Sequence, residues 1–207
     1  MPKEETIQNA IRIFEQHHGW LRTSQAIQLG ISPRTLYALR DSGHIVRLSR
    51  GVYRLADAPV NQHQDLLIVA QRIPKGVVCL ISALAFHNLT TQIPHQVYLA
   101  LPNHAEKPRL AYPPLRLFWL SKRSYQAGIE THVFEGIPVR IYSAEKSVAD
   151  AFKFRNRIGL DVALEALKMY RRSKFFDVQK LMDMARSDRV EKIIRPYVEI
   201  LYSGGIS

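Results

Sequence analysis

The feature that most constrains the fold is the run of cap and turn residues in GISPRTLYALRDSGHIVRLSRGVYRL, residues 30–55. Ser32 followed by Pro33 is typical of a helix start, because the serine oxygen accepts from first-turn amides and proline has no N–H to satisfy. Gly43 is typical of a helix that ends in a left-handed residue. The pattern therefore predicts a helix from Pro33 to just before Gly43, with Leu36 and Leu39 on its buried face.

A second short helix is expected immediately upstream. Thr23 or Ser24 would cap it, and it would run to Leu29, with Gly30 forming the tight turn before the next helix. The small Ala26 would let the two helices approach closely, and this order of elements predicts a helix-turn-helix. An earlier amphipathic segment, residues 6–17, is expected to be a third helix that closes a small core.

Two β-rich runs follow Gly43 and predict a hairpin. Residues 45–48 and 52–55 flank Ser49-Arg50-Gly51, which has the composition of a turn. Three helices followed by a hairpin predict a winged helix in residues 1–57. In such a unit the second helix of the motif enters the major groove and the wing contacts backbone or a minor groove.

The charge balance agrees with a polyanionic partner. The 207-residue chain has 29 Lys and Arg against 18 Asp and Glu, a formal net charge of +11. The excess is spread along the chain, but residues 22–54 hold six arginines and a single acid, Asp41. Arginine is the better residue for bidentate contacts to phosphate and to guanine edges.

These observations predict a set of residues that contact DNA. Arg34, Thr35 and Tyr37 are expected on the exposed face of the helix, and Arg47, Arg50 and Arg54 near the surface of the hairpin. Two alternatives stay open, namely that Tyr37 is half-packed and that Arg40 pairs with a neighbouring carboxylate. The full set of expected DNA contacts is Arg22, Thr23, Ser32, Arg34, Thr35, Tyr37, Arg40, Arg47, Arg50 and Arg54.

Residues 58–207 are expected to form a mixed α/β domain with a helical C-terminal part, so the fold class is α+β. After an expected boundary at Asp57-Ala58-Pro59, the patterns predict helices over 60–73 and 82–89, the latter capped by Ser82. Strands are predicted over 77–82, 96–102 and 115–121, and a hairpin over 128–142. From Ser143 the period becomes helical, with segments 143–156, 159–172, 176–186 and 189–202.

The helical part carries a second group of basic residues interleaved with aromatics. It is either a second surface for nucleic acid or a partner, or the solvated face of a packed bundle. Its members are Lys153, Arg155, Arg157, Lys168, Arg171, Arg172 and Lys174.

No motif in the chain predicts catalysis, a metal site or a cofactor. His87, His95 and His104 lack metal-ligand spacing. The carboxylates that a metal-dependent nuclease would need, Glu130, Glu135, Glu145 and Asp150, are interpreted as structural. The lone Cys79, the absence of a long apolar run and the absence of a secretory signal predict a cytoplasmic protein without membrane contact.

Three segments of the chain resemble the AbiEi-type antitoxins of type IV, abortive-infection toxin–antitoxin systems. Residues 19–57, GWLRTSQAIQLGISPRTLYALRDSGHIVRLSRGVYRLAD, resemble the N-terminal winged-helix domain of that family. SALAFHNLTTQIPHQVYLALP and YSAEKSVADAFKFRNRIGLDVALEALK resemble its C-terminal antitoxin domain. Family members often have proline where this chain has Ala144.

The resemblance implies a repressor that binds inverted repeats in its own promoter. It also implies a functional partner, a nucleotidyltransferase-like toxin whose effect is opposed without obligatory contact between the two proteins. Some members of the family are stand-alone transcriptional regulators without a toxin. A monomer or weak dimer is expected, and a winged-helix nuclease or a protein-interaction module are the competing interpretations.

Overall fold

The computed structural model describes residues 4–58 and 63–203. The chain divides into two compact units. The N-terminal unit is Met1–Pro74 with Pro108–Pro113 and Val133–Val139, and the C-terminal unit is Lys75–Lys107, Pro114–His132 and Arg140–Ser207. Pro59 of the predicted boundary, and residues 60–62 of the predicted helix 60–73, lie outside the described residues; the rest of that helix is α4, Gln64–Arg72.

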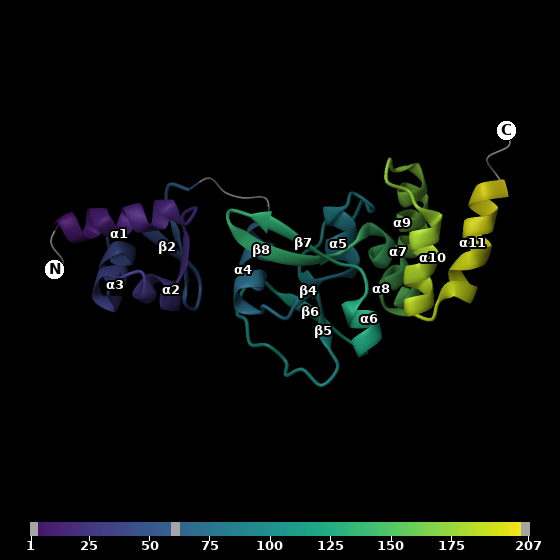
Figure 1. Ribbon diagram of the computed structural model, residues 1–207, viewed down its shortest axis with the longest axis horizontal. Helices are drawn as coiled ribbons and strands as arrows, with labels where there is room; N and C mark the ends of the chain where they lie inside the picture. Colours follow the sequence, from purple (N-terminus) through teal and green to yellow (C-terminus); the bar gives the residue numbers. More distant parts are fainter. Residues whose placement is uncertain (1–3, 59–62, 204–207) are drawn as a thin grey trace. The chain divides into compact units, whose positions relative to one another are not determined.

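The N-terminal unit combines short helices with a small antiparallel sheet (Figure 1). The sheet has the order β1-β3-β2, so β3 is its central strand. Its core contains Phe14, Ala26, Leu36, Leu39 and Ile45. Besides α4, its helices and complete strands are α1 Glu4–Gln16, β1 Trp20–Arg22, α2 Thr23–Gln28, α3 Pro33–Asp41, β2 Ile45–Ser49 and β3 Val52–Leu55.

The predicted cap and turn chemistry of α3 is confirmed. The backbone N–H of Thr35 donates to Oγ of Ser32 at 3.1 Å, and Pro33 occupies the first turn. Gly43 has a φ of +80°, a conformation that costs glycine little, and the N–H of His44 then bonds to the carbonyl of Leu39 at 2.9 Å. Local sequence therefore determines both ends of this helix.

The start of α2 differs from the prediction. The cap position is Arg22, and Thr23 is the first helical residue. The backbone N–H of Arg22 donates to Oε1 of Gln25 at 3.0 Å, so the side chain three residues downstream satisfies the N–H of the cap residue itself, as in half of a capping box. Arg22 also ends β1, a strand that the sequence patterns did not predict.

The C-terminal unit is built on a mixed sheet. The five strands have the order β6-β5-β4-β8-β7, with β5 parallel to β6, β4 antiparallel to β5, and β4 parallel to β8. Figure 1 shows α7, α9 and α10 side by side next to this sheet, as their contacts require. The strands are β4 Val77–Val78, β5 Val97–Pro102, β6 Leu115–Leu120, β7 Ile129–Phe134 and β8 Ile137–Tyr142. The helices are α5 Leu80–Phe86, α6 Lys122–Gln126, α7 Ala144–Lys153, α8 Arg155–Ile158, α9 Leu160–Arg172, α10 Val178–Ser187 and α11 Glu191–Ser203.

The predicted strand over residues 77–82 is wrong in its second half. Only Val77 and Val78 are extended in the sheet, and α5 begins at Leu80 rather than at a Ser82 cap. Ser82 lies inside this helix, where its buried Oγ accepts from the N–H of Tyr98 at 3.0 Å. A short, fully buried apolar run has no periodicity that separates helix from strand, which explains the error.

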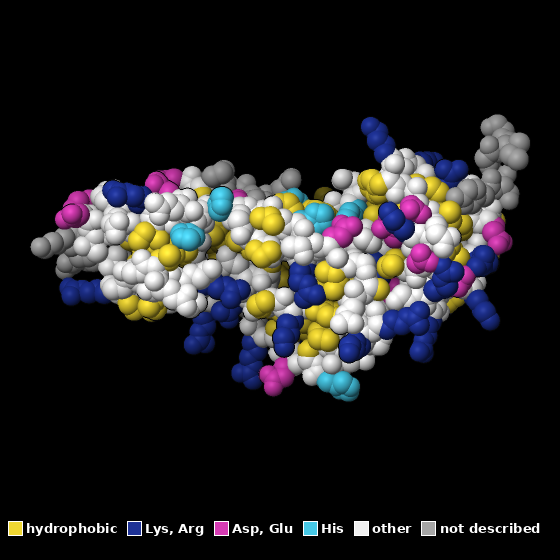
Figure 2. Space-filling view, in the orientation of Figure 1, with side chains coloured by type: hydrophobic (Ala, Val, Ile, Leu, Met, Phe, Trp, Pro, Cys, Tyr) yellow, Lys and Arg dark blue, Asp and Glu magenta, His cyan; other side chains and the backbone are white. Residues whose placement is uncertain are grey.

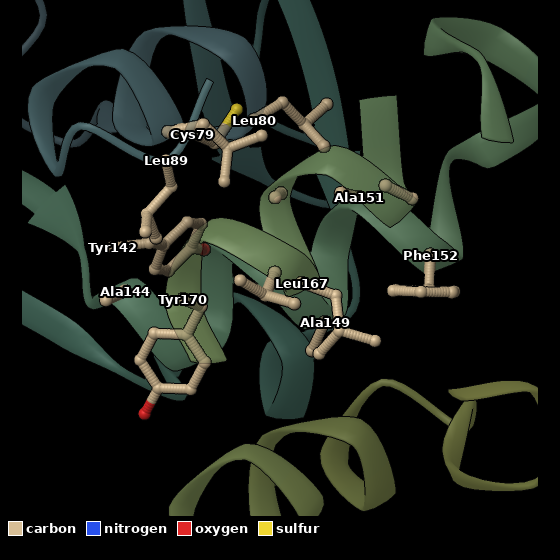
Figure 3. Close-up of a cluster of buried hydrophobic side chains, with 14 of the residues drawn as sticks. Cys79, Leu80, Leu89, Tyr142, Ala144, Ala149, Ala151, Phe152, Leu167 and Tyr170 are labelled. Carbon is tan, nitrogen blue, oxygen red and sulfur yellow. The ribbon is translucent and has the colours of Figure 1, made fainter. Parts of the chain in front are cut away.

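The core of the C-terminal unit is made mainly by α5, α7, α9 and the sheet. Figure 3 shows Tyr142, Leu167 and Tyr170 among small residues of α7, with Cys79 and Leu80 above them. The small residues Ala149 and Ala151 let these elements pack closely, and both are fully buried. Burial raises the pKa of the Cys79 thiol well above its ordinary value, so this cysteine acts as a small hydrophobe.

Candidate nucleic-acid interface

Helix α3 presents an exposed face next to its capped end. Arg34 is exposed, and the Tyr37 side chain is 48% exposed, although tyrosine is usually more buried. Leu36 and Leu39 on the other face are fully buried in the core, as predicted. Arg34 and Tyr37 are three residues apart and therefore project from neighbouring positions on the helix surface.

Thr35 does not lie on the exposed face, and this part of the prediction is wrong. Its side chain is only 4% exposed, and its Oγ1 lies 2.9 Å from Oγ of Ser32. Ser32 itself is exposed, but its oxygen already accepts the cap hydrogen bond from Thr35. Both hydroxyls thus stabilise the first turn of α3. The exposed polar side chain of this turn that takes no part in capping is that of Arg34.

The hairpin exposes two of its three predicted arginines. Arg47 and Arg50 are exposed, with Arg50 beside Gly51 at the turn, where φ is +74°. Arg54, expected near the hairpin surface, is instead 7% exposed. The reason is the unpredicted strand β1, which pairs with β3 on the side opposite β2 and places Trp20 against Arg54.

Five of the predicted residues surround one hollow of about 420 Å³ between α3 and the hairpin. Tyr37 also lines a second hollow of about 840 Å³, together with Arg34 of α3 and Ile7 of α1. The first hollow is lined by Thr23, Tyr37, Arg40, Arg47, Arg50, Gly51 and Tyr53. Residues up to 27 positions apart in sequence are therefore brought to one surface.

The charge of this surface is mostly uncompensated. Arg40 forms an ion pair with Asp41, in which the nearest atoms are 2.7 Å apart. Among the described residues, Arg34, Arg47 and Arg50 form no ion pair. The bond to Asp41 raises the pKa of Arg40, whose guanidinium also lies 5.2 Å from the centre of the Tyr37 ring. The alternative that Arg40 pairs with a neighbouring carboxylate is thus confirmed.

Arg22 lies partly buried at the end of β1. Burial and then the charge of Arg72 lower its pKa. Since an arginine pKa starts far above physiological pH, the side chain stays cationic.

The second group of basic residues separates into two parts. Lys153, Arg155 and Arg157 belong to the end of α7 and to α8, and Lys153 pairs with the buried Asp188 at 3.2 Å. Lys168, Arg171, Arg172 and Lys174 are exposed at or just after the end of α9. Cations near a helix C-terminus are favoured by the helix dipole, so the α9 group also has a structural explanation.

The carboxylates considered for catalysis lie apart. Glu130 pairs with His132 at 3.1 Å, and Glu145 accepts from the hydroxyl of Tyr170 at 2.9 Å. Glu135 follows β7 in the hairpin turn, and Asp150 is buried in α7. Over residues 4–58 and 63–203, no group of three or more His, Cys, Asp or Glu side chains could hold a metal ion.

The histidines do not gather into a site either. Nε2 of His87 lies 2.7 Å from the backbone carbonyl of Tyr142, while His95 and His104 are exposed in loops. Burial lowers the pKa of His87. In the part of the chain that the structure describes, no helix has the length and apolar character needed to cross a membrane.

One charged grouping was missed by the sequence patterns. Lys146 contacts both Asp150 and Asp188 in the interior of the C-terminal unit. The four-residue spacing of Lys146 and Asp150 on one helix is a signal that could have indicated their pairing. Nothing in the sequence links either residue to Asp188, which follows α10.

The N-terminal surface thus belongs to a helix-rich unit with an exposed arginine-bearing helix and hairpin, the composition expected of a nucleic-acid-binding module. Residues 9–56 match the family model for transcriptional regulators described as AbiEi antitoxins. The resemblance to this family is therefore confirmed over the segment that contains α2, α3 and the hairpin. No curated protein sequence matches the chain.

A solved structure shares the fold. The chain is similar to the RV2827C protein from Mycobacterium tuberculosis, with a TM-score of 0.58 and 11% sequence identity. The similarity covers 92% of this chain and 80% of that protein. The α+β fold of this chain therefore occurs in a second solved structure.

Proposed function

We propose that residues 1–57 form a winged helix-turn-helix that binds operator DNA, and that residues 58–207 form an antitoxin-type domain. In this proposal α3 enters the major groove, with Arg34 and Tyr37 at base edges, and the β2–β3 hairpin is the wing. The protein represses its own operon by binding inverted repeats in the promoter and acts as a type IV antitoxin.

The observation that best supports the proposal is that α3 and the hairpin share one surface. Tyr37 and Arg40 from the helix, and Arg47 and Arg50 from the hairpin, line one hollow. Three exposed arginines near it, Arg34, Arg47 and Arg50, form no ion pair among the described residues, so their charge is available to phosphate. The family match over residues 9–56 supports the same assignment.

The test is a gel-shift titration of the full chain with its own upstream DNA at two salt concentrations, with scrambled duplex as competitor. Specific binding that survives the competitor and weakens steeply with salt supports an operator-binding repressor. Including Mg²⁺ in one series tests the nuclease alternative, since cleavage of the probe would indicate an enzyme. A failure to shift any DNA would favour a protein-interaction module.

The antitoxin part of the proposal needs a separate test in cells. The neighbouring gene, if it encodes a nucleotidyltransferase-like protein, is expressed with and without this chain, and growth is measured. Restored growth supports the antitoxin assignment, and a pull-down then shows whether the two proteins touch. Operator binding without growth rescue would leave the alternative of a stand-alone regulator without a toxin.

A further inference from the structure

Two arginines meet on the edge of the five-stranded sheet in the C-terminal unit. Arg116 belongs to the edge strand β6, and Arg157 belongs to α8. Arg116 lies over the rings of Tyr98 and Phe118, and Arg157 over those of Phe118 and Phe154. These five residues are named the Arg116–Arg157 cluster. Figure 2 shows Lys and Arg side chains distributed, among hydrophobic and uncharged ones, over the face of the C-terminal unit that this view presents.

The guanidinium of Arg157 lies over two aromatic rings. The guanidinium carbon lies 4.3 Å from the centre of the Phe118 ring and 5.9 Å from that of Phe154. The two rings meet edge to face at 5.0 Å, and Phe118 is buried. A guanidinium stacked by its face keeps its N–H groups at the edge, where they point away from the ring.

Hydrogen bonds to neutral oxygens position Arg116. One Nη donates to the hydroxyl of Tyr98 at 3.1 Å and the other to the backbone carbonyl of Arg157 at 3.1 Å. The guanidinium carbon lies 5.3 Å from the centre of the Tyr98 ring. Since Tyr98 and Arg116 are register partners in β5 and β6, the sheet itself fixes this geometry.

The cluster keeps its full positive charge. Among residues 4–58 and 63–203, no carboxylate forms an ion pair with Arg116, Arg155 or Arg157, and no hydrogen bond uses a side-chain N–H of Arg157. Elsewhere in the same unit, exposed arginines do have such partners, for example Arg186 with Asp183 and Arg195 with Glu191. The neutral partners of the cluster orient two cations without neutralising them.

We propose that the Arg116–Arg157 cluster is a phosphodiester-binding surface, separate from the α3 and hairpin surface. A planar guanidinium with a free N–H edge matches two phosphate oxygens at once, and its stacking reduces the entropy lost on binding. Arg155, half-buried on the same short helix, adds charge beside it. The proposal goes beyond operator recognition, because it assigns sequence-independent binding to the C-terminal unit.

The experiment uses the full chain with Arg47→Gln and Arg50→Gln, which removes wing charge and leaves binding by the C-terminal unit visible. Scrambled duplex DNA and single-stranded RNA of equal length, both fluorescently labelled, are titrated across a salt series by anisotropy. Adding Arg157→Gln should weaken binding several-fold at low salt. The slope of log K against log salt should fall by about 0.9 on duplex DNA or about 0.7 on the single strand.

Two further variants separate phosphate contact from other effects. Arg157→Lys keeps the charge and should restore most of the slope, while unfolding midpoints check that each variant is folded. Arg186→Gln, an exposed arginine that already has a carboxylate partner, should leave the slope unchanged. A slope change on one probe only identifies duplex DNA or RNA as the ligand.

Three results would overturn the proposal: equal slopes with and without Arg157→Gln, an equal loss in Arg186→Gln, or no binding of either probe by the wing variant. The last result would leave operator binding by the unmodified chain intact, so the two proposals fail independently. Conversely, if the chain showed no preference for its operator, Arg157→Gln could still reduce the slope of log K against log salt on scrambled DNA.

Discussion

Lys146 and Asp188 form a buried ion pair across 42 positions of sequence, with Nζ 2.7 Å from Oδ2 and both side chains fully inaccessible to solvent. Lys146 also lies 2.6 Å from Oδ1 of Asp150 on its own helix. The pair joins α7 to the residue that follows α10. Its charges are balanced within the C-terminal unit, which makes it a structural element rather than a binding site.

Lys146→Met should destabilise the protein strongly. The change leaves the carboxylates of Asp150 and Asp188 buried without their central cation, and breaking such a pair costs about 3–5 kcal/mol. Urea unfolding followed by circular dichroism measures the loss. The exposed pair of Arg186 and Asp183 is the matched control, since Arg186→Ala should cost less than about 1 kcal/mol. Similar losses for both variants would refute a special role for burial.

Stability should depend on pH through Asp150. Burial, only partly offset by Lys146, raises the pKa of Asp150 from 3.8 to about 7, so the folded state holds a proton that the unfolded chain releases. The resulting stabilisation is complete below 3.8 and is lost as pH rises toward 7. Burial by itself would raise the pKa of Asp188, but the charge of Lys146 and the interactions with Asp150 and Ser124 outweigh burial, so this pKa is lowered and Asp188 makes stability rise with pH instead.

Asp150→Asn isolates the Asp150 contribution, since the amide mimics the protonated carboxyl and does not titrate. The difference in unfolding free energy between the wild type and this variant should shift in favour of the variant as pH rises from about 4 to about 7. Denaturation at a series of pH values measures it. A difference that is constant across this window would mean that Asp150 is ionised in the folded protein throughout.

Ser32→Ala should lower stability without changing sequence preference. The variant removes the acceptor for the N–H of Thr35 at the start of α3, which typically costs about 1 kcal/mol. Thermal unfolding measures the stability, and competition gel shifts measure the preference. A changed preference would show that the hydroxyl of Ser32 contacts a base in addition to capping the helix.

The accuracy of the sequence-based predictions follows the range of the interactions involved. The cap of α3, Gly43 and the hairpin turn depend on residues within a few positions, and the pattern predicted each of them. The burial of Arg54 depends on β1, whose three residues carry no strand signal and pair with β3 from 30 to 34 positions away. A three-residue strand is too short to show periodicity, so its effect on Arg54 could not be predicted.

The range of the interactions also explains why the sequence indicated one arginine-bearing surface and not the other. The local charge excess of residues 22–54 indicated the first surface, and the fold brought Arg40, Arg47 and Arg50 together around it. Arg157 was recognised only as one of several basic residues, because its position over Phe118 depends on where β6 lies in the sheet. The burial of a side chain and the identity of its partners need the tertiary structure, whereas the charge excess and the cap of α3 do not.

Arg50→Ala should lower affinity for any DNA sequence. Arg50 is exposed at the turn of the hairpin, where a backbone phosphate is the expected contact. The loss of one phosphate contact reduces the salt slope by about 0.9 on duplex DNA. Titrations of operator and scrambled probes across a salt series measure both slopes, and unchanged slopes on both would remove the hairpin from the interface.

Arg34→Ala should weaken operator binding by about 1–3 kcal/mol and relax the preference at the base it reads. Arg34 is exposed on the first turn of α3 and has no ion-pair partner among the described residues, so it can donate two hydrogen bonds to a guanine edge. Because the side chain lies outside the core, folding should be unaffected. Competition gel shifts with single-base operator variants measure the effect. An equal loss on operator and scrambled DNA would assign Arg34 to a phosphate, and Tyr37 would then be the remaining candidate for base contact on the exposed face of α3.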